Sequence, residues 1–240
     1  MNESLNKSLR ENENKKVFKD ILVKISKSRD IRKSFEDFVL CSAYAISNSC
    51  NYNNDIEQEY LNIAKKYSKN ELSDFAQMLA YLQLECVKDN PIDILGNVYE
   101  EIGMSNKAKG QFFTPESVCD LITSLTLSDK NINENIEKKG YFSMNDPACG
   151  SGRFLFSAID YLKDKNVPLN KVLVEGDDIS LLCCCMTYIN LSLRGINGYV
   201  KHQNMLSQEQ WQVFYTPAFV MNIELQDCIK RNNKEYEVEV

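Results

Sequence analysis

Residues 145–154 constrain the fold of this 240-residue chain most, because they place an acid and two near-adjacent glycines between a strand-like and a helix-like segment. Upstream, residues 141–144 have the aromatic and apolar character of a short buried strand, and from Phe154 onward apolar residues recur at helical spacing. Gly150 and Gly152 permit positive φ angles and a close backbone approach to a ligand, at which the free N–H groups of the new helix point. The stretch therefore predicts a strand, a tight loop and a helix.

Two residues that dinucleotide-binding loops and P-loops require are missing from this loop. A dinucleotide fingerprint would need a third glycine where Leu155 stands, and a P-loop would need a lysine after the glycines. These departures argue against NAD and ATP. A turn with two glycines is also common as a plain structural turn, so the segments around it must decide between the two interpretations.

A second acidic turn follows. Residues 171–176 read as a buried strand, and Asp177 and Asp178 stand at its end, before a helical run over 179–193. In nucleotide-binding α/β units the acid after the second strand takes the ribose hydroxyls. We expect this role for Asp178, with Asp177 as second choice; the alternative is that both aspartates only cap the following helix.

Residues 1–104 lack strand-like alternation. Apolar stripes at helical spacing run over 35–46, 60–67 and 72–82, and Pro91 is typical of the first turn of a further helix. We expect a bundle of four or five helices over 1–104, followed by a cofactor-binding domain over 105–240.

Composition bounds the protein class. With 43% hydrophobic and 26% charged residues, no apolar run long enough to span a bilayer and no signal-like N-terminus, we expect a cytoplasmic globular protein that does not bind membranes. The nine cysteines form neither a C-x-x-C pair nor a Cys/His pattern, and His202 is the only histidine, so we expect reduced thiols and no metal site. Cys183, Cys184 and Cys185 lie in the second helical run, where packing is the expected role.

Four phrases occur in order: KGQFFTPE at 109–116, DPACGSG at 146–152, EGDDI at 175–179 and YINLSLRGI at 188–196. They resemble motifs of the N-6 adenine DNA methyltransferases, most closely of the modification (M) subunit of type I restriction-modification systems, over residues 105–206. The resemblance implies an α/β fold. A helical N-terminal region would precede a partial Rossmann-like S-adenosylmethionine-dependent methyltransferase domain with a mostly parallel sheet.

S-adenosylmethionine is the cofactor that this resemblance implies. Phe113 and Thr114 would hold its methionine end, Asp146 the amino group of that end, and Asp178 the ribose. Asn204 stands where the family often has an acid that accepts from the adenine amino group, and its amide can also hydrogen-bond there. The implied cofactor-binding positions are Phe113, Thr114, Asp146, Ala148, Gly150, Gly152, Asp178, Ile179 and Asn204.

The family's catalytic loop reads [ND]-P-P-[FYW] after the fourth strand and holds the amino group of an extruded adenine. Residues 218–221 are expected to form that strand and Asn222 to be the catalytic residue, with Ile223, Glu224 and Leu225 in place of the prolines and the aromatic ring. The domain would then be truncated after its fourth strand. The alternation over 234–240 predicts one more strand that could close the sheet.

Charge is uneven along the chain. Residues 1–33 hold ten basic and five acidic residues, so with a net charge of −6 for the chain the remainder carries −11. Because phosphate contacts by lysine and arginine dominate DNA affinity, we expect DNA binding through a complex, with a specificity subunit or a second copy as partner. Two hypotheses remain: part of a restriction-modification adenine methyltransferase, or a catalytically degenerate S-adenosylmethionine-binding module with a structural or regulatory role.

Overall fold

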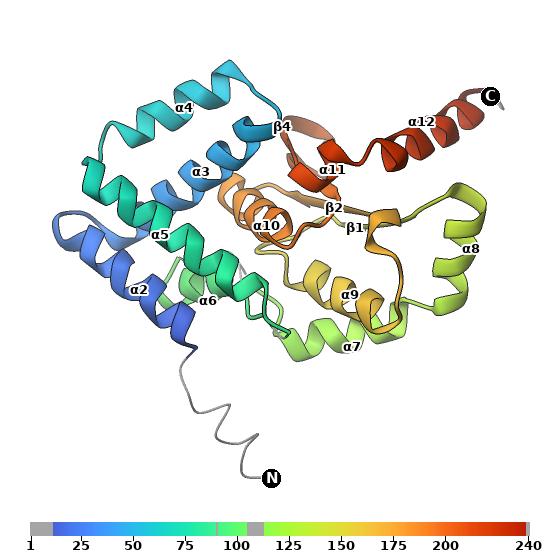
Figure 1. Ribbon diagram of the computed structural model, residues 1–240, viewed down its shortest axis with the longest axis horizontal. Helices are drawn as coiled ribbons and strands as arrows, with labels where there is room; N and C mark the ends of the chain where they lie inside the picture. Colours follow the sequence, from blue (N-terminus) through green and yellow to red (C-terminus); the bar gives the residue numbers. More distant parts are fainter. Residues whose placement is uncertain (1–11, 90, 105–112, 239–240) are drawn as a thin grey trace, which may run out of the picture.

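A computed structural model describes residues 12–89, 91–104 and 113–238 of the chain (Figure 1). Its first part consists of α2 (Glu13–Ile25), α3 (Ile31–Cys50), α4 (Asn54–Ala64), α5 (Lys69–Cys86) and α6 (Ile94–Glu101), with a 3-10 turn at Ser26–Ser28. Each of these helices begins at a side chain that accepts from a backbone N–H of the first turn, and on α5 Ser68 and Glu71 form a capping box. The expected helical N-terminal region is confirmed.

The second part is built around a four-stranded sheet in the order β1, β2, β3, β4. The strands are β1 (Phe142–Asp146), β2 (Val172–Asp178), β3 (Gly198–Asn204) and β4 (Glu209–Tyr215). The first three run parallel, and β4 pairs antiparallel with β3. The helices α7 (Glu116–Thr126) and α8 (Asp129–Lys139) precede β1, α9 (Arg153–Asp164) connects β1 to β2, and α10 (Leu181–Leu193) connects β2 to β3. The α/β class with a mostly parallel sheet is confirmed.

The crossover helices α9 and α10 lie on one face of the sheet (Figure 1). On that face, a Cβ added to Gly176 of β2 would lie 3.4 Å from Leu155 of α9. Tyr188 of α10 packs on Phe214 of β4, with ring centroids 5.3 Å apart. Since parallel strands end at the same edge, this arrangement brings the loops after β1, β2 and β3 together.

The helical layer and the sheet share one apolar core. Helix α3 packs on α10, and Tyr44 of α3 stacks on Phe214 of β4 with ring centroids 6.3 Å apart. The buried apolar side chains form one contiguous cluster that extends from Phe18 in α2 to Val200 in β3. The division at residues 104 and 105 separates helices from sheet, and as a boundary between folding units it stays a prediction.

Two strands expected near the C-terminus are wrong. Residues 218–221 lie in helix α11 (Pro217–Met221), where the Thr216 hydroxyl accepts from the N–H of Phe219 and Pro217 fits the first turn. Residues 234–238 continue α12 (Ile223–Val238), so they add no strand to the sheet. The fourth strand is instead the segment that forms β4, which follows β3 after a short turn.

The cysteines of α10 have the packing role expected of them. Cys183, Cys184 and Cys185 are all buried. Burial raises the pKa of the Cys183 thiol to about 12 and also raises the pKa of the other two thiols, so all three stay protonated at neutral pH. Within the described residues, no three or more potential ligands gather as a metal would require, and no helix has the length and apolarity to cross a membrane.

Candidate functional site at the carboxyl edge of the sheet

The loop between β1 and α9 has the backbone conformation that its glycines predict. Gly150 and Gly152 have φ angles of 57° and 94°, in the left-handed region that side chains other than glycine rarely adopt. A Cβ at Gly150 would lie 2.8 Å from the ring of Phe113, and one at Gly152 would lie 2.7 Å from the ring of Phe156. Both the turn and the close packing therefore require glycine.

This loop is joined directly to the end of β2. The N–H of Cys149 donates to the carbonyl of Asp177 at 2.9 Å, and the N–H of Gly150 donates to Oδ2 of Asp178 at 3.0 Å. The other Asp178 oxygen accepts from the N–H of Ser180 at 2.8 Å. Ser180, not an aspartate, is the N-cap of α10. The two acidic turns found in the sequence thus converge on one place.

The two aspartates have different surroundings. Asp177 is fully buried, and its oxygens accept from the side-chain amides of Asn145 in β1 and Gln203 in β3, both at 2.7 Å. Its carboxylate therefore joins three neighbouring strands and has no free direction toward a ligand. Asp178 is partly exposed beside the loop, which favours it over Asp177 as a ligand-binding group.

Negative charge accumulates at this edge. Desolvation raises the pKa of the Asp146 carboxyl, and the charges of Asp178 and Asp177 raise it further. Desolvation also raises the pKa of Asp178, against the N–H groups of Ser180 and Gly150 that stabilise its ionised form. A cationic or hydrogen-donating ligand would relieve this accumulation of acceptors.

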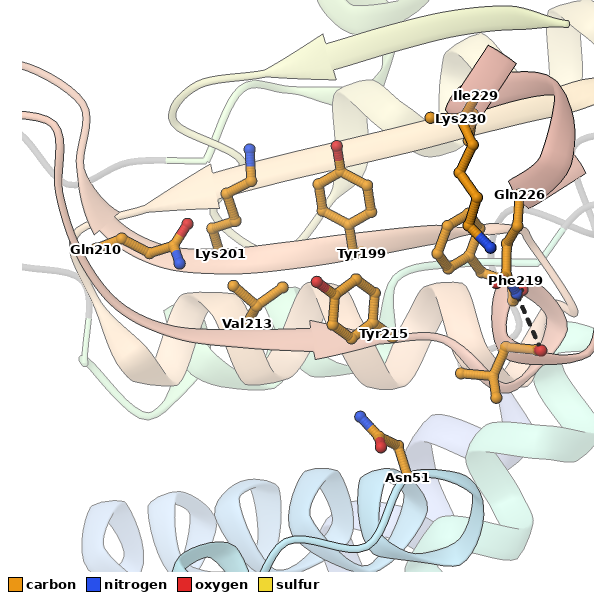
Figure 2. A pocket seen from close by; sticks show the side chains of 11 residues that line it. Asn51, Tyr199, Lys201, Gln210, Val213, Tyr215, Phe219, Gln226, Ile229 and Lys230 are labelled. Carbon is orange, nitrogen blue, oxygen red and sulfur yellow. Dashed lines mark hydrogen bonds between the residues drawn. The ribbon is translucent and has the colours of Figure 1, made fainter. Parts of the chain in front are cut away.

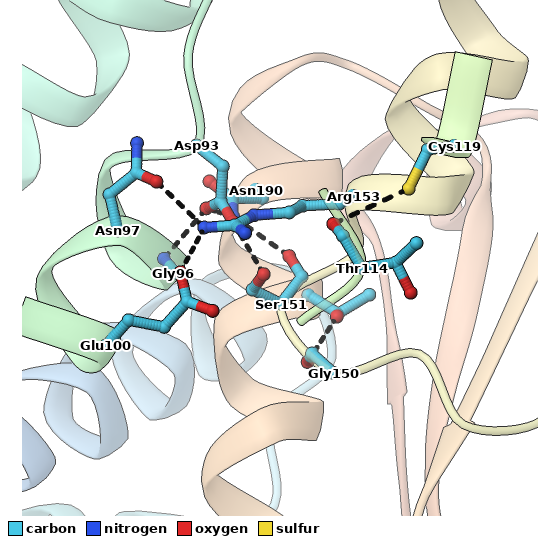
Figure 3. Close-up of polar contacts among 11 residues, drawn as sticks. Asp93, Gly96, Asn97, Glu100, Thr114, Cys119, Gly150, Ser151, Arg153 and Asn190 are labelled. Atoms are coloured by element: carbon cyan, nitrogen blue, oxygen red, sulfur yellow. Dashed lines mark hydrogen bonds and ion pairs between the residues drawn. The ribbon is translucent and has the colours of Figure 1, made fainter. Parts of the chain in front are cut away.

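A network of polar contacts holds the loop between β1 and α9 against α6 (Figure 3). The Arg153 guanidinium reaches toward α6, with its Nε 3.0 Å from Asp93 Oδ2 and its Nη2 3.1 Å from Glu100 Oε2 and 2.8 Å from Asn97 Oδ1. The Ser151 hydroxyl donates to the same Asp93 oxygen at 2.5 Å. Arg153 also lies over the Phe113 ring, with the guanidinium carbon 5.3 Å from the ring centroid. It anchors the loop to the helical layer.

Side chains of helix α10 form hydrogen bonds to backbone carbonyls of the same loop. The Thr187 hydroxyl donates to the carbonyl of Gly150 at 2.9 Å, and the Asn190 amide donates to the carbonyl of Ser151 and to Asp93, both at 3.2 Å. Sequence reasoning missed Asp93 and Thr187 as parts of the site. Asn190 stands inside the YINLSLRGI phrase, which was a usable signal, whereas nothing local to Asp93 indicates its contact with a loop 58 positions away.

A hollow of about 70 Å³ lies between the loop and the segment after residue 112. It brings together the expected residues Phe113, Thr114, Asp146, Ala148 and Gly150. The preceding residues of the KGQFFTPE phrase, 109–112, lie outside the described part of the chain. Because sites for drug-sized ligands have volumes of about 300–1,000 Å³, this hollow can enclose only one end of such a ligand.

The remaining expected residues lie along the same edge. The Ile179 side chain is 62% exposed beside Asp178, and its carbonyl lies 3.2 Å from Nε2 of His202. Asn204 ends β3, but its side-chain oxygen already accepts from the N–H groups of Leu206 and Ser207. The Asn204 amide nitrogen is the group it has left to offer a ligand.

Asn222 lies at the opposite edge of the sheet. Its side-chain amide donates to the carbonyl of Asn170, which precedes β2, at 2.8 Å and to Oδ1 of Asn197 at 3.0 Å, while its oxygen accepts from the N–H of Leu225. The length of β2, about 20 Å at 3.3 Å per residue, separates it from Asp178. The expected catalytic placement of Asn222 is therefore wrong: the residue connects α11 and α12 to the amino-terminal edge.

A glycine loop after the first parallel strand, a carboxylate after the second and helical crossovers between them define a Rossmann-like α/β protein with its site at the carboxyl edge. The sequence agrees at the level of family. The family model described as N-6 DNA Methylase matches residues 90–235, and the chain belongs to this family. The match includes α6, and so the Asp93 network.

Two curated relatives are methylase subunits. The chain is 31% identical to the type I restriction enzyme MjaIX methylase subunit of Methanocaldococcus jannaschii, over 45% of this chain and 18% of that one. It is 25% identical to the MpnII methylase subunit of Mycoplasma pneumoniae, over 60% of this chain and 26% of that one. The chain thus spans about a fifth to a quarter of these relatives' length.

A weaker structural likeness extends to a chain described as a class I S-adenosylmethionine-dependent methyltransferase from Listeria monocytogenes. It has a TM-score of 0.46 and 17% identity, covering 79% of this chain and 53% of that one. The likeness is too low to carry an argument, so the fold assignment rests on this chain's own sheet and crossovers.

Proposed function

We propose that this chain is the cofactor-binding part of an S-adenosylmethionine-dependent DNA adenine methyltransferase of the restriction-modification kind. The observation that carries the proposal is the 3.0 Å hydrogen bond from the N–H of Gly150 to Asp178, which joins the glycine loop to the second acid and so supports a single ligand position shared by both. The curated relatives are type I methylase subunits, which supports the same activity.

The residues present fit the chemistry of the cofactor. Its methionine end carries an ammonium group and a sulfonium, both positive, and would lie in the 70 Å³ hollow beside Asp146, whose pKa burial and neighbouring acids raise. Phe113 and Thr114 would close that end. The ribose would then lie at Asp178 and the adenine along the open edge, where Ile179 offers exposed apolar surface and Asn204 an amide.

When bound, S-adenosylmethionine supplies an electrophilic methyl group for transfer to an adenine amino nitrogen. The residues at the carboxyl edge would bind and orient that group. Among the described residues, the family's base-holding loop has no counterpart at this edge, because Asn222 lies at the other end of the strands. We therefore propose that a partner, either a specificity subunit or a second copy of the chain, completes the base pocket. The same partner would make most of the contacts with DNA.

Titration calorimetry with S-adenosylmethionine tests cofactor binding. We expect heat of binding for the wild type and its loss in Asp178→Ala, with binding unchanged in Asp164→Ala, which removes an exposed carboxylate at the far end of α9. Circular dichroism checks that both variants fold. An absence of heat in the wild type, or equal binding in the two variants, would contradict the proposal.

The alternative is a non-catalytic S-adenosylmethionine-binding module, which the family match and the methylase relatives do not favour. A methyl-incorporation assay on unmodified DNA, with and without a specificity subunit, separates the two. Incorporation that needs the subunit, is lost in Asp178→Ala and survives in Asn222→Ala supports the enzyme. Cofactor binding without incorporation in either setting supports the module.

A further inference from the structure

A second cavity lies on the sheet face opposite α9 and α10. It has a volume of about 570 Å³ and is lined by side chains of β3, β4, α11 and α12, with Asn51 after α3 at one side. Tyr199 pairs with Tyr215 across the strands, next to the first residue of β3. Figure 2 shows Tyr199, Lys201, Val213 and Tyr215 projecting from one side of the two strands, with Gln226 and Lys230 reaching in from α12.

Three aromatic rings line this cavity. Tyr215 and Phe219 are stacked at 17° with centroids 5.9 Å apart, and Tyr199 lies 5.7 Å from the first and 6.0 Å from the second. Tyr215 is 37% exposed, so part of it remains open to a ligand. Such a group of rings offers stacking to a planar base, which is sequence-tolerant because every nucleobase has a π-face.

The charged residues that line the cavity are basic, while the Glu175 carboxylate lies beside Tyr199 and Lys201. Lys201 and Lys230 are among the lining residues, and none of the described lining residues is acidic. Lys201 lies 5.0 Å from the centre of the Tyr199 ring and 3.5 Å from Glu175, so part of its charge is already balanced. Lys230 has a side chain 69% exposed, with Asp227 at 3.8 Å as a weak partner, and it is the better phosphate ligand.

The cavity dimensions favour a small ligand over a protein. A volume of about 570 Å³ falls within the range of small-molecule sites, roughly 300–1,000 Å³. Gln226 donates both its amide hydrogens to the carbonyls of Phe219 and Val220, which leaves its side-chain oxygen as an acceptor for a base. Rings, an amide oxygen and an exposed cation together match a nucleobase that carries a phosphate.

We propose that this cavity, named here the β3–β4 cleft, binds a nucleoside phosphate, with the base on Tyr215 and Phe219 and the phosphate at Lys230. The ligand is either a free nucleotide or one nucleotide of a single strand. Methyl transfer is not required for this binding, because the cleft and the glycine loop lie on different parts of the sheet.

Titration calorimetry on the full chain tests the cleft with two pyrimidine probes, thymidine monophosphate and tetrathymidylate, which carry no adenine that could enter the adenosyl position. We expect Tyr215→Ala and Lys230→Glu each to weaken binding about tenfold, as loss of one base-stacking ring or one phosphate contact does. Lys163→Glu, an exposed charge reversal on α9, and Asp178→Ala should bind as the wild type does.

Binding of both probes with similar affinity assigns the cleft to a free nucleotide, and binding of the tetramer alone assigns it to a single strand. The proposal is overturned if neither probe binds the wild type, or if Lys230→Glu binds like Lys163→Glu. Because Lys230 is exposed, its substitution leaves the fold intact. The comparison of Lys230→Glu with Lys163→Glu therefore tests the proposal even if Tyr215→Ala unfolds. Loss of calorimetric binding of S-adenosylmethionine would leave this result unaffected.

Discussion

Gly150 combines two demands that can be separated by substitution. Its φ of +57° disfavours any side chain, and an added Cβ would lie 2.8 Å from Phe113. Gly195 has a similar φ of +66° with nothing within 4 Å of an added Cβ. We expect Gly195→Ala to lower the free energy of unfolding by about 1–2 kcal/mol, the left-handed backbone cost, and Gly150→Ala to lower it further. If urea unfolding shows the same loss of free energy in the two variants, the Phe113 ring moves aside at no cost in stability.

Asp146 should make the proposed cofactor site sensitive to acid. Burial and neighbouring acids raise its pKa, so on acidification it takes up a proton at a higher pH than an ordinary aspartate does. The neutral form attracts a cation less, and we expect the affinity for S-adenosylmethionine to fall as the pH drops through this raised pKa. Calorimetry over a pH series measures the fall. The fall should be shallower in Asp146→Asn, and a parallel fall in both would assign the titration to another group.

At the level of residues, the sequence predicted the part of the site that is local in the chain. The glycine loop and Asp178 carry their own turn chemistry, so the sequence located the loop and the strand end, while their roles toward a cofactor stay predictions. Asp93 was not found, because its role comes from tertiary packing against Ser151 and Arg153. Asp93 and this loop are too far apart in the sequence for periodicity to connect them, so only the folded structure shows the contact.

Among the elements, α6 holds the loop through a buried charge. Removing Asp93 leaves the 9% exposed side chain of Arg153 without its nearest charged partner, with Glu100 and Asn97 remaining. We expect Asp93→Ala to lower the free energy of unfolding by about 3 kcal/mol, the lower end for breaking a buried ion pair.

Asp129→Ala is the matched control for this prediction. It removes a surface partner of Lys165, where both side chains are about half exposed, at 55% and 44%. The loss should be below about 1 kcal/mol. Chemical denaturation measures both variants. If the two losses are the same, the Asp93 network does not stabilise the loop.

The elements that sequence reasoning assigned wrongly share a cause. The run over 218–221 is too short for periodicity to separate a strand from a helix, and the deciding signal was the preceding Thr216 and Pro217, an N-cap and a first-turn proline. The tail over 234–238 alternates, but α12, capped by Asn222, continues through it. A segment of alternating polar and apolar residues forms a strand only where it can pair with the edge of a sheet.

For the whole molecule, the shared core argues for a single folding unit. Tyr44 in the helical layer stacks on Phe214 in the sheet, and the buried cluster is continuous between them. We expect one calorimetric transition whose enthalpy agrees with the van't Hoff value, because separating the layers would expose Phe214, which is fully buried.

Tyr44→Ala sharpens this prediction, because it removes a contact between the layers without touching the carboxyl edge. In a single unit it should lower the one transition as a whole, by about 3 kcal/mol, as for other large-to-alanine changes in a core. In two independent units it would shift only the transition of the helices over 12–104, and a second transition would keep its temperature. A divided thermogram would thus place a folding boundary near residues 104 and 105, and the shared core would be only a docking interface between two domains.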